Sequence, residues 1–199
     1  MSEMPTETNE HLEHAMHAGH EVAGGNTFIG TVAMSIAVLA VVAATVGSLE
    51  TLESGGAISA KNEAVLLQNK ASDSWAFYQA KSLKKNMYEI AGAAAADGPL
   101  KLDYAARSKR YDEESADIQK DAKKLQDESA AKMVEGDTHE HRHHILTAAV
   151  TFLHVGIALA TISIVTGGKR WPWLVALALG LAGVVGTAYA YLPMAAAAH

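Results

Sequence analysis

The stretch TFIGTVAMSIAVLAVVAATVGSL, residues 27–49, contains no Asp, Glu, Lys or Arg. Charged residues are also absent between Arg142 and Lys169, and again from Trp171 to the end of the sequence. Each run exceeds the roughly 20 apolar residues that cross a hydrocarbon core about 30 Å thick. Backbone polar groups inside lipid must be paired within the chain, so runs of this kind form helices. The pattern predicts transmembrane helices over residues 27–49, 145–166 and 171–192.

Composition narrows the class of protein further. The chain has 199 residues, no cysteine and a formal net charge of −6. The absence of cysteine excludes disulfides and thiol chemistry, and the modest acidic charge argues against a nucleic-acid partner. The first apolar run is too long for the core of a cleavable signal peptide and follows a tail without Lys or Arg. We therefore expect this run to remain as a membrane span in contact with lipid.

Residues 1–26 form a polar tail that is rich in Glu and His. Its hydrophobicity is too low for a packed structure. Its histidines recur at every third position, and they could bind a metal or simply be solvated: His11, His14, His17 and His20.

The charged segment between the first and second spans, residues 50–144, is rich in good helix formers. Asp97-Gly98-Pro99 interrupts it, and Pro cannot continue a helix. The pattern predicts a helical hairpin domain with arms over about 58–96 and 100–135, because helices joined by so short a break fold back antiparallel. Gly55-Gly56 is expected to be a helix end or a hinge before the first arm, and Gly136-Asp137 is expected to end the second arm. The predicted fold is all-α, with three transmembrane helices and a long antiparallel hairpin inserted between the first and second.

Each arm carries a stripe of residues at alternating steps of three and four, which is typical of a coiled-coil seam. On the first arm the expected seam is Ala76, Ala80, Leu83, Met87, Ile90 and Ala94. On the second arm it is Tyr104, Ser108, Tyr111, Ser115, Ile118, Ala122, Leu125 and Ser129. So narrow and Ser-rich a seam buries little apolar surface. We therefore expect the hairpin to pack against copies of itself or against a partner.

Two rules of membrane topology disagree for this chain. The short Lys169-Arg170 loop is positively charged, and such loops are favoured in the cytoplasm. Long segments cross a membrane largely regardless of their charge. Together these rules place the hairpin in the periplasm. Against this, the amino-terminal tail has no positive charge, and Lys61, Lys132 and Arg142 lie near the membrane ends of the hairpin. We prefer the periplasmic hairpin.

Two strings in the first arm carry a resemblance: KNEA at residues 61–64 and ASDSWAFYQAK at residues 71–81. With them, the chain resembles a family of small bacterial membrane proteins that is known only as a domain of unknown function. The resemblance covers nearly the whole chain. It implies a His- and Glu-rich tail, one span, a Lys-rich helical region and two closing spans, in the inner membrane of a bacterium. It implies no activity.

Four histidines lie close together just before the second span: His139, His141, His143 and His144. Imidazole is a suitable ligand for Zn, Cu or Ni, so this group is a candidate metal site. The alternative interpretation is a solvated, hydrophilic end of the span, and we favour it. No other cofactor is expected.

His154 lies near the middle of the second span, where an ionisable residue is costly. Thr147, Thr151 and Thr161 fall on the same helical face and extend it into a polar stripe. The stripe could form a proton or ion path, or His154 could be a neutral residue hydrogen-bonded to a neighbouring helix. We favour the second interpretation.

The third span has small residues at every fourth position: Ala178, Ala182, Gly186 and Ala190. Small residues let helix backbones approach closely in lipid. We interpret them as the contact face of a homo-oligomer.

The sequence has no glycine-rich phosphate loop, no nucleophile elbow and no His-Glu-x-x-His helix, so we do not expect an enzyme. We expect a self-associating membrane scaffold or accessory subunit that presents its hairpin to protein partners. One alternative is an oligomeric channel or a stator-like ion-conducting subunit, by analogy of layout alone. The other is a His-based metal-binding membrane protein.

Overall fold

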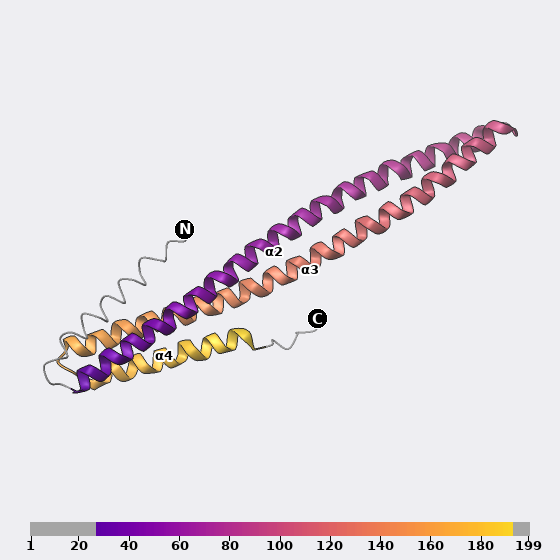
Figure 1. The fold of residues 1–199 in the computed structure, drawn as a ribbon. Helices are drawn as coiled ribbons and strands as arrows, with labels where there is room; N and C mark the ends of the chain where they lie inside the picture. Colours follow the sequence, from indigo (N-terminus) through magenta and orange to yellow (C-terminus); the bar gives the residue numbers. More distant parts are fainter. Residues whose placement is uncertain (1–26, 193–199) are drawn as a thin grey trace. The chain divides into compact units, whose positions relative to one another are not determined.

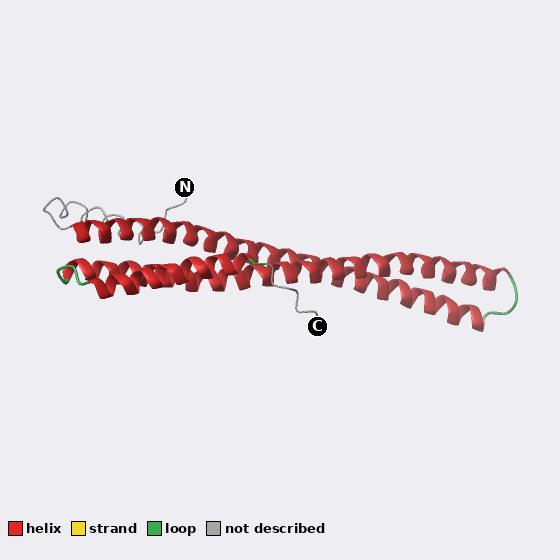
Figure 2. Ribbon diagram, turned by 90° about the horizontal axis from the view of Figure 1, so that it is seen from below, coloured by secondary structure: helices red, strands yellow, loops and turns green. Residues whose placement is uncertain are grey.

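The computed structural model describes residues 27–192, so the predicted tail over residues 1–26 lies outside the described residues. The described part of the chain consists of three α-helices and contains no strand (Figures 1 and 2). They are α2 (Thr27–Ala94), α3 (Pro99–Val165) and α4 (Arg170–Tyr191). Each contains a stretch long and apolar enough to cross a membrane. The all-α class is therefore confirmed over residues 27–192.

Helices α2 and α3 are longer than the glycine positions suggest. Helix α2 has 68 residues and passes through Gly55-Gly56, and α3 has 67 residues and passes through Gly136-Asp137. The helix ends expected at these two places are wrong. A glycine inside a helix lowers the stability of the helix by only about 1 kcal/mol relative to an alanine, and close packing can offset this loss. Gly136 shows such packing, because a Cβ there would lie 2.7 Å from Cγ of Lys61.

The chain turns at the two other predicted breaks. Helix α2 ends at Ala94 and α3 begins at Pro99, in agreement with the break at Asp97-Gly98-Pro99. Between α3 and α4, Gly167 and Gly168 have φ values of +74° and +84°, which L side chains rarely adopt. The turn is closed by the Gly168 amide, which donates to the Ser163 carbonyl at 3.0 Å.

The helices contribute to two compact units. Among the described residues, unit 1 contains 27–56 and 138–192, and unit 2 contains 57–137.

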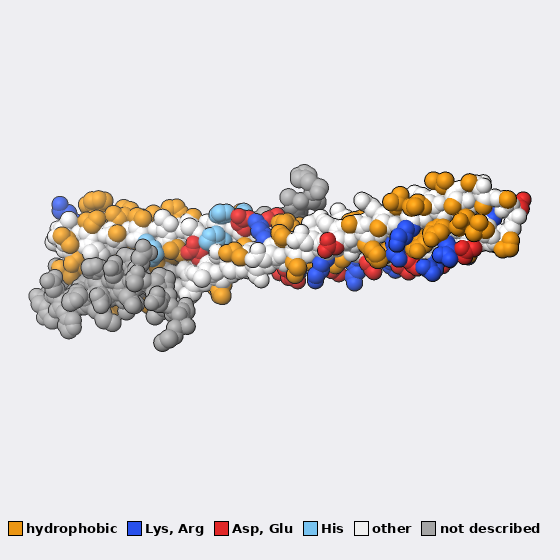
Figure 3. All heavy atoms as spheres, turned by 90° about the horizontal axis from the view of Figure 1, so that it is seen from above, with side chains coloured by type: hydrophobic (Ala, Val, Ile, Leu, Met, Phe, Trp, Pro, Cys, Tyr) orange, Lys and Arg blue, Asp and Glu red, His pale blue; other side chains and the backbone are white. Residues whose placement is uncertain are grey.

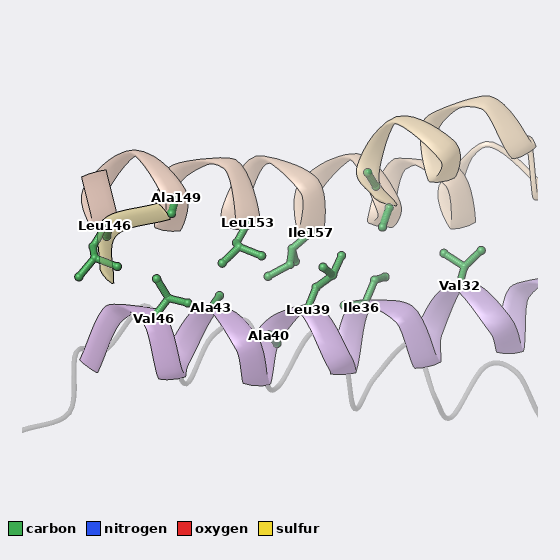
Figure 4. Close-up of a cluster of buried hydrophobic side chains, with 13 residues drawn as sticks. Val32, Ile36, Leu39, Ala40, Ala43, Val46, Leu146, Ala149, Leu153 and Ile157 are labelled. Carbon is green, nitrogen blue, oxygen red and sulfur yellow. The ribbon is translucent and has the colours of Figure 1, made fainter. Parts of the chain in front are cut away.

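Unit 1 has an apolar core that is made of small and branched side chains (Figure 4). Val32, Ile36, Leu39, Ala40, Ala43 and Val46 of α2 face Leu146, Ala149, Leu153 and Ile157 of α3. Helix α4 adds Ala176 and Ala190, and its Trp173 indole donates to the Ser35 hydroxyl at 3.2 Å. Many large apolar side chains on the outside of this unit stay exposed.

In unit 2, residues of α2 contact residues of α3 in reverse order along the chain. Glu63 pairs with Lys132 at 3.1 Å, and Lys81 pairs with Glu114 at 2.6 Å. On the second arm, the Ser and Ala residues of the expected seam are buried, and its Tyr, Ile and Leu residues are partly buried. Ser129 donates a buried hydrogen bond of 2.8 Å to the Ala64 carbonyl, across the two helices.

The seam expected on the first arm is wrong, because all six of its residues are exposed. The face of α2 that contacts α3 instead contains the buried Ala57, Ala60, Ala64 and Ala71, followed by the partly buried Tyr78, Lys81, Lys85 and Tyr88.

Specific polar and aromatic contacts explain this choice of face. The Lys81 and Lys85 ammonium groups reach Glu114 and Asp112 at 2.6 and 2.8 Å. Their aliphatic stems can cover apolar surface on the way. The Tyr88 ring stacks on a tyrosine ring of α3, with the centroids 5.7 Å apart. Long amphipathic side chains therefore occupy positions that a hydrophobic pattern assigns to the outside.

Candidate functional site

Unit 1 contains a polar network that the sequence pattern did not reveal. Its centre is Glu53 of α2, which is only 7% exposed. Nδ1 of His139 lies 2.6 Å from Oε2 of Glu53, and Nη1 of Arg142 lies 3.9 Å from Oε1. The Tyr191 side chain of α4 interacts with the same carboxylate, and the Arg142 guanidinium lies 5.5 Å from the Tyr191 ring centroid. One carboxylate thus joins all three helices.

The network continues one helical turn earlier on α2, at Glu50. The Thr147 hydroxyl donates to Oε1 of Glu50 at 2.5 Å. Nδ1 of His143 lies 3.8 Å from the same oxygen, beyond hydrogen-bond distance, and is buried without a hydrogen-bond partner. Helical periodicity explains the alignment, because residues three or four apart share one face of a helix. We define the polar network as Glu50, Glu53, His139, Arg142, His143, Thr147 and Tyr191.

The electrostatics of the network follow from its burial. A buried carboxylate is stable only when it is paired and hydrogen-bonded, since leaving water is costly for a charge. Glu53 has a guanidinium and an imidazole of α3 and an uncharged phenol of α4 around it. The arrangement can therefore hold a carboxylate inside an otherwise apolar unit. Figure 3 shows histidine side chains beside carboxylates on the visible face.

The four histidines clustered at residues 139–144 separate onto different faces of α3. His139 and His143 belong to the polar network, whereas His141 and His144 are exposed. Nε2 of His144 lies 4.0 Å from a Glu140 carboxylate oxygen. Among residues 27–192, no group of three or more His, Asp or Glu side chains is arranged to hold a metal ion. The structure thus gives the candidate metal site no common centre.

The polar stripe around His154 is also divided. Thr147 contacts Glu50, and His154 is partly buried. The Thr151 and Thr161 hydroxyls donate to carbonyls one turn earlier in their own helix, at 2.8 and 2.9 Å. These two donors therefore serve α3 itself.

The small residues expected to form an oligomer face occupy two different environments. Ala178 and Ala182 are exposed, whereas Gly186 is partly buried and Ala190 is buried within unit 1. Another glycine of α4, Gly183, packs closely against α3. A Cβ at Gly183 would lie 2.8 Å from Cγ of Leu153 and 2.9 Å from the Ala149 carbonyl oxygen.

Unit 2 exposes a continuous apolar surface. We name it the outer stripe and define it by the six exposed residues Ala76, Ala80, Leu83, Met87, Ile90 and Ala94. The exposed fractions of Leu83, Met87 and Ile90 are 61%, 61% and 70%. Figure 3 shows hydrophobic side chains beside Lys and Arg over this part of the chain. The largest apolar side chains of this stretch of α2 are therefore on its outside.

Comparison with known proteins identifies one related family. A family model described as a domain of unknown function, DUF4337, matches residues 28–193. No curated protein and no solved structure matches the chain.

Proposed function

Because the chain belongs to the DUF4337 family, whose description carries no activity, we propose a function from the geometry of the two units. The protein is a membrane-anchored helical scaffold or accessory subunit of the bacterial inner membrane. Unit 1 is the three-helix anchor, in contact with lipid. Unit 2 is a helical hairpin that the anchor presents to protein partners.

The anchor is supported by composition and by packing. Three apolar stretches have the length and hydropathy of membrane spans. They pack through small residues such as Ala43, Ala149 and Gly183, which is common for helices in lipid. Trp171, at the start of α4, is exposed beside the basic loop, a position typical of an interfacial aromatic residue.

The observation that carries the proposal is the outer stripe. Fully burying a Leu, Ile or Met side chain contributes about 1.5–3 kcal/mol, and contiguous exposed apolar surface marks interaction sites. In unit 2, Leu83, Met87 and Ile90 stay mostly exposed, so most of this gain is not realised within one chain. The fully buried positions between α2 and α3 in unit 2, the inner seam, are occupied by small residues, mainly Ala and Ser. A hairpin of this composition is suited to binding another protein surface along α2.

Topology can be tested with single cysteines, because the natural chain has none. We place the hairpin in the periplasm and the Lys169-Arg170 loop in the cytoplasm. An impermeant maleimide should therefore label Gly98→Cys from the periplasm, and should label Lys169→Cys only after the inner membrane is disrupted. Both positions are exposed. The reverse order of labelling would contradict this orientation.

The scaffold function predicts that the outer stripe contacts protein in living cells. A photo-crosslinking amino acid at Leu83 should give protein adducts on illumination. The same amino acid at Lys124, an exposed position on α3, should give few, because charged neighbours surround it. An absence of adducts at Leu83, with the protein correctly inserted, would contradict the scaffold function.

An ion-conducting subunit is the second candidate, and the polar network is the observation in its favour. Glu50 and Glu53 are ionisable, face histidines and lie in an apolar three-helix unit, as residues of proton relays do. The partners of Glu53 nevertheless close the network around one carboxylate, which also suits a purely structural role. Proton flux through reconstituted wild-type and Glu53→Gln protein separates the two functions.

A further inference from the structure

We infer that the outer stripe pairs with the outer stripe of a second copy of this chain, as a parallel two-stranded coiled coil between α2 helices. This inference rests on the proposed scaffold function, and it identifies a second copy of the chain as the first partner of the hairpin. The stripe extends about 27 Å along α2, from Ala76 to Ala94, at 1.5 Å of rise per residue.

The spacing of the stripe indicates a helix as its occupant. Its residues alternate steps of four and three from Ala76 to Ala94 without an interruption. That repeat keeps a seam aligned along a second helix, whereas lipid or an irregular protein surface does not require it. Helix α3 does not use this repeat, because α2 contacts α3 through the opposite face, with Lys81, Lys85 and Tyr88.

The chemistry of the stripe fits an identical helix. All six of its residues are apolar, so two copies can meet without burying a charge. The three alanines allow close approach, and Leu83, Met87 and Ile90 supply side chains that interlock between two helices.

The flanking residues favour a parallel pair over an antiparallel one. Lys84 follows Leu83 in the sequence. In a parallel coiled coil, Lys84 of one helix faces Gln79 of the other helix, which is five positions earlier. An antiparallel pair centred on the stripe would instead bring two Lys84 side chains together. The Lys84 ammonium also lies 5.8 Å from the Tyr111 ring centroid of its own chain, so this charge already has an aromatic neighbour in unit 2.

Membrane anchorage supports the same pairing. Copies that insert with one topology point their α2 helices in the same direction. Each stripe begins the same number of residues after the first apolar stretch, so identical residues meet in register. Confinement to one membrane also raises the effective concentration of one stripe for the other.

Single cysteines in the full-length protein in liposomes test the inference. Under mild oxidation, Leu83→Cys and Ile90→Cys should each form disulfide-linked dimers, because disulfides need Cα atoms within about 7 Å. Glu89→Cys is the matched control: it is adjacent to Ile90, exposed, and outside the stripe. We expect about fivefold less dimer at Glu89.

Each outcome is informative. Strong dimer formation at residues 83 and 90 with little at residue 89 supports the homodimer. Equal crosslinking at all three positions indicates random collision and overturns it. Absence of dimers at all three, combined with heterologous adducts from the photo-crosslinker at Leu83 in cells, overturns the homodimer and leaves the scaffold function standing. Absence of both kinds of product overturns both proposals. Helix content by circular dichroism establishes that each variant is folded.

Discussion

Glu53→Ala is expected to lower the free energy of unfolding of unit 1 by about 2–3 kcal/mol. The substitution removes the carboxylate that His139, Arg142 and Tyr191 share, and so breaks contacts among all three helices. Loss of one partner from a buried pair can cost about 3–5 kcal/mol, but the His139 and Arg142 side chains are 30% and 35% exposed and can partly rehydrate. Equilibrium unfolding in mixed micelles, followed by circular dichroism, gives the value.

Two further variants sharpen this measurement. Glu63→Ala removes an exposed carboxylate of the same helix, whose pair with Lys132 is solvated, and should cost about 0–1 kcal/mol. Glu53→Gln keeps an acceptor for His139 and should retain part of the stability. Equal effects of Glu53→Ala and Glu63→Ala would contradict the role assigned to the polar network.

The Glu53→Gln variant also decides between the two candidate functions. A structural network predicts no proton flux in liposomes that contain the wild-type protein. If wild type conducts protons, and Glu53→Gln abolishes the flux while keeping its fold, the ion-conducting function replaces the scaffold.

Gly183→Ala is expected to destabilise the packing of α4 on α3 by about 1–3 kcal/mol, although alanine is the better helix former. The new Cβ would lie 2.9 Å from the Ala149 carbonyl oxygen, a backbone atom that cannot rotate away. Relief requires the two helices to separate, which loosens the core contacts around Leu153. The same unfolding assay in mixed micelles measures the effect.

Gly186→Ala is the matched control, one helical turn later. Its Cβ would lie 3.6 Å from Cβ of Ala149, an ordinary contact, so the gain in helix propensity of about 1 kcal/mol should prevail. The two substitutions are thus expected to have opposite signs. A Gly183→Ala variant as stable as wild type would mean that the backbones of α3 and α4 approach less closely than the structure indicates.

Some features of this protein follow from local sequence alone. Three long runs without charged residues predict three apolar helices, because length and hydropathy are properties of a continuous segment. The break at Asp97-Gly98-Pro99 follows in the same way, since Pro restricts the backbone wherever it occurs. The KNEA and ASDSWAFYQAK strings, together with the layout of the chain, indicated a family known only as a domain of unknown function, and a family model of that description matches residues 28–193.

The inner seam of unit 2 was predictable on only one of its two helices. On α3 the charged residues lie on the other faces of the helix, and one face carries Ser108, Ser115 and Ser129. The sequence pattern therefore identifies this face as the buried side of α3. On α2 two faces have helical spacing: an apolar one with Leu83 and Ile90, and one built from Ala, Tyr and Lys. Hydrophobicity selects the first, whereas ion pairs and ring stacking with α3 select the second.

The polar network depended wholly on tertiary structure. The sequence places Glu50 and Glu53 just after an apolar run and the four histidines just before another, but it does not say which side chains turn inward. That is decided by the rotation of α2 relative to α3 and α4 within unit 1. The same rotation separates His139 and His143 from His141 and His144, and brings Gly183 closer to α3 than Gly186. Spacing along one helix defines a face, but only the neighbouring helices determine whether that face is buried.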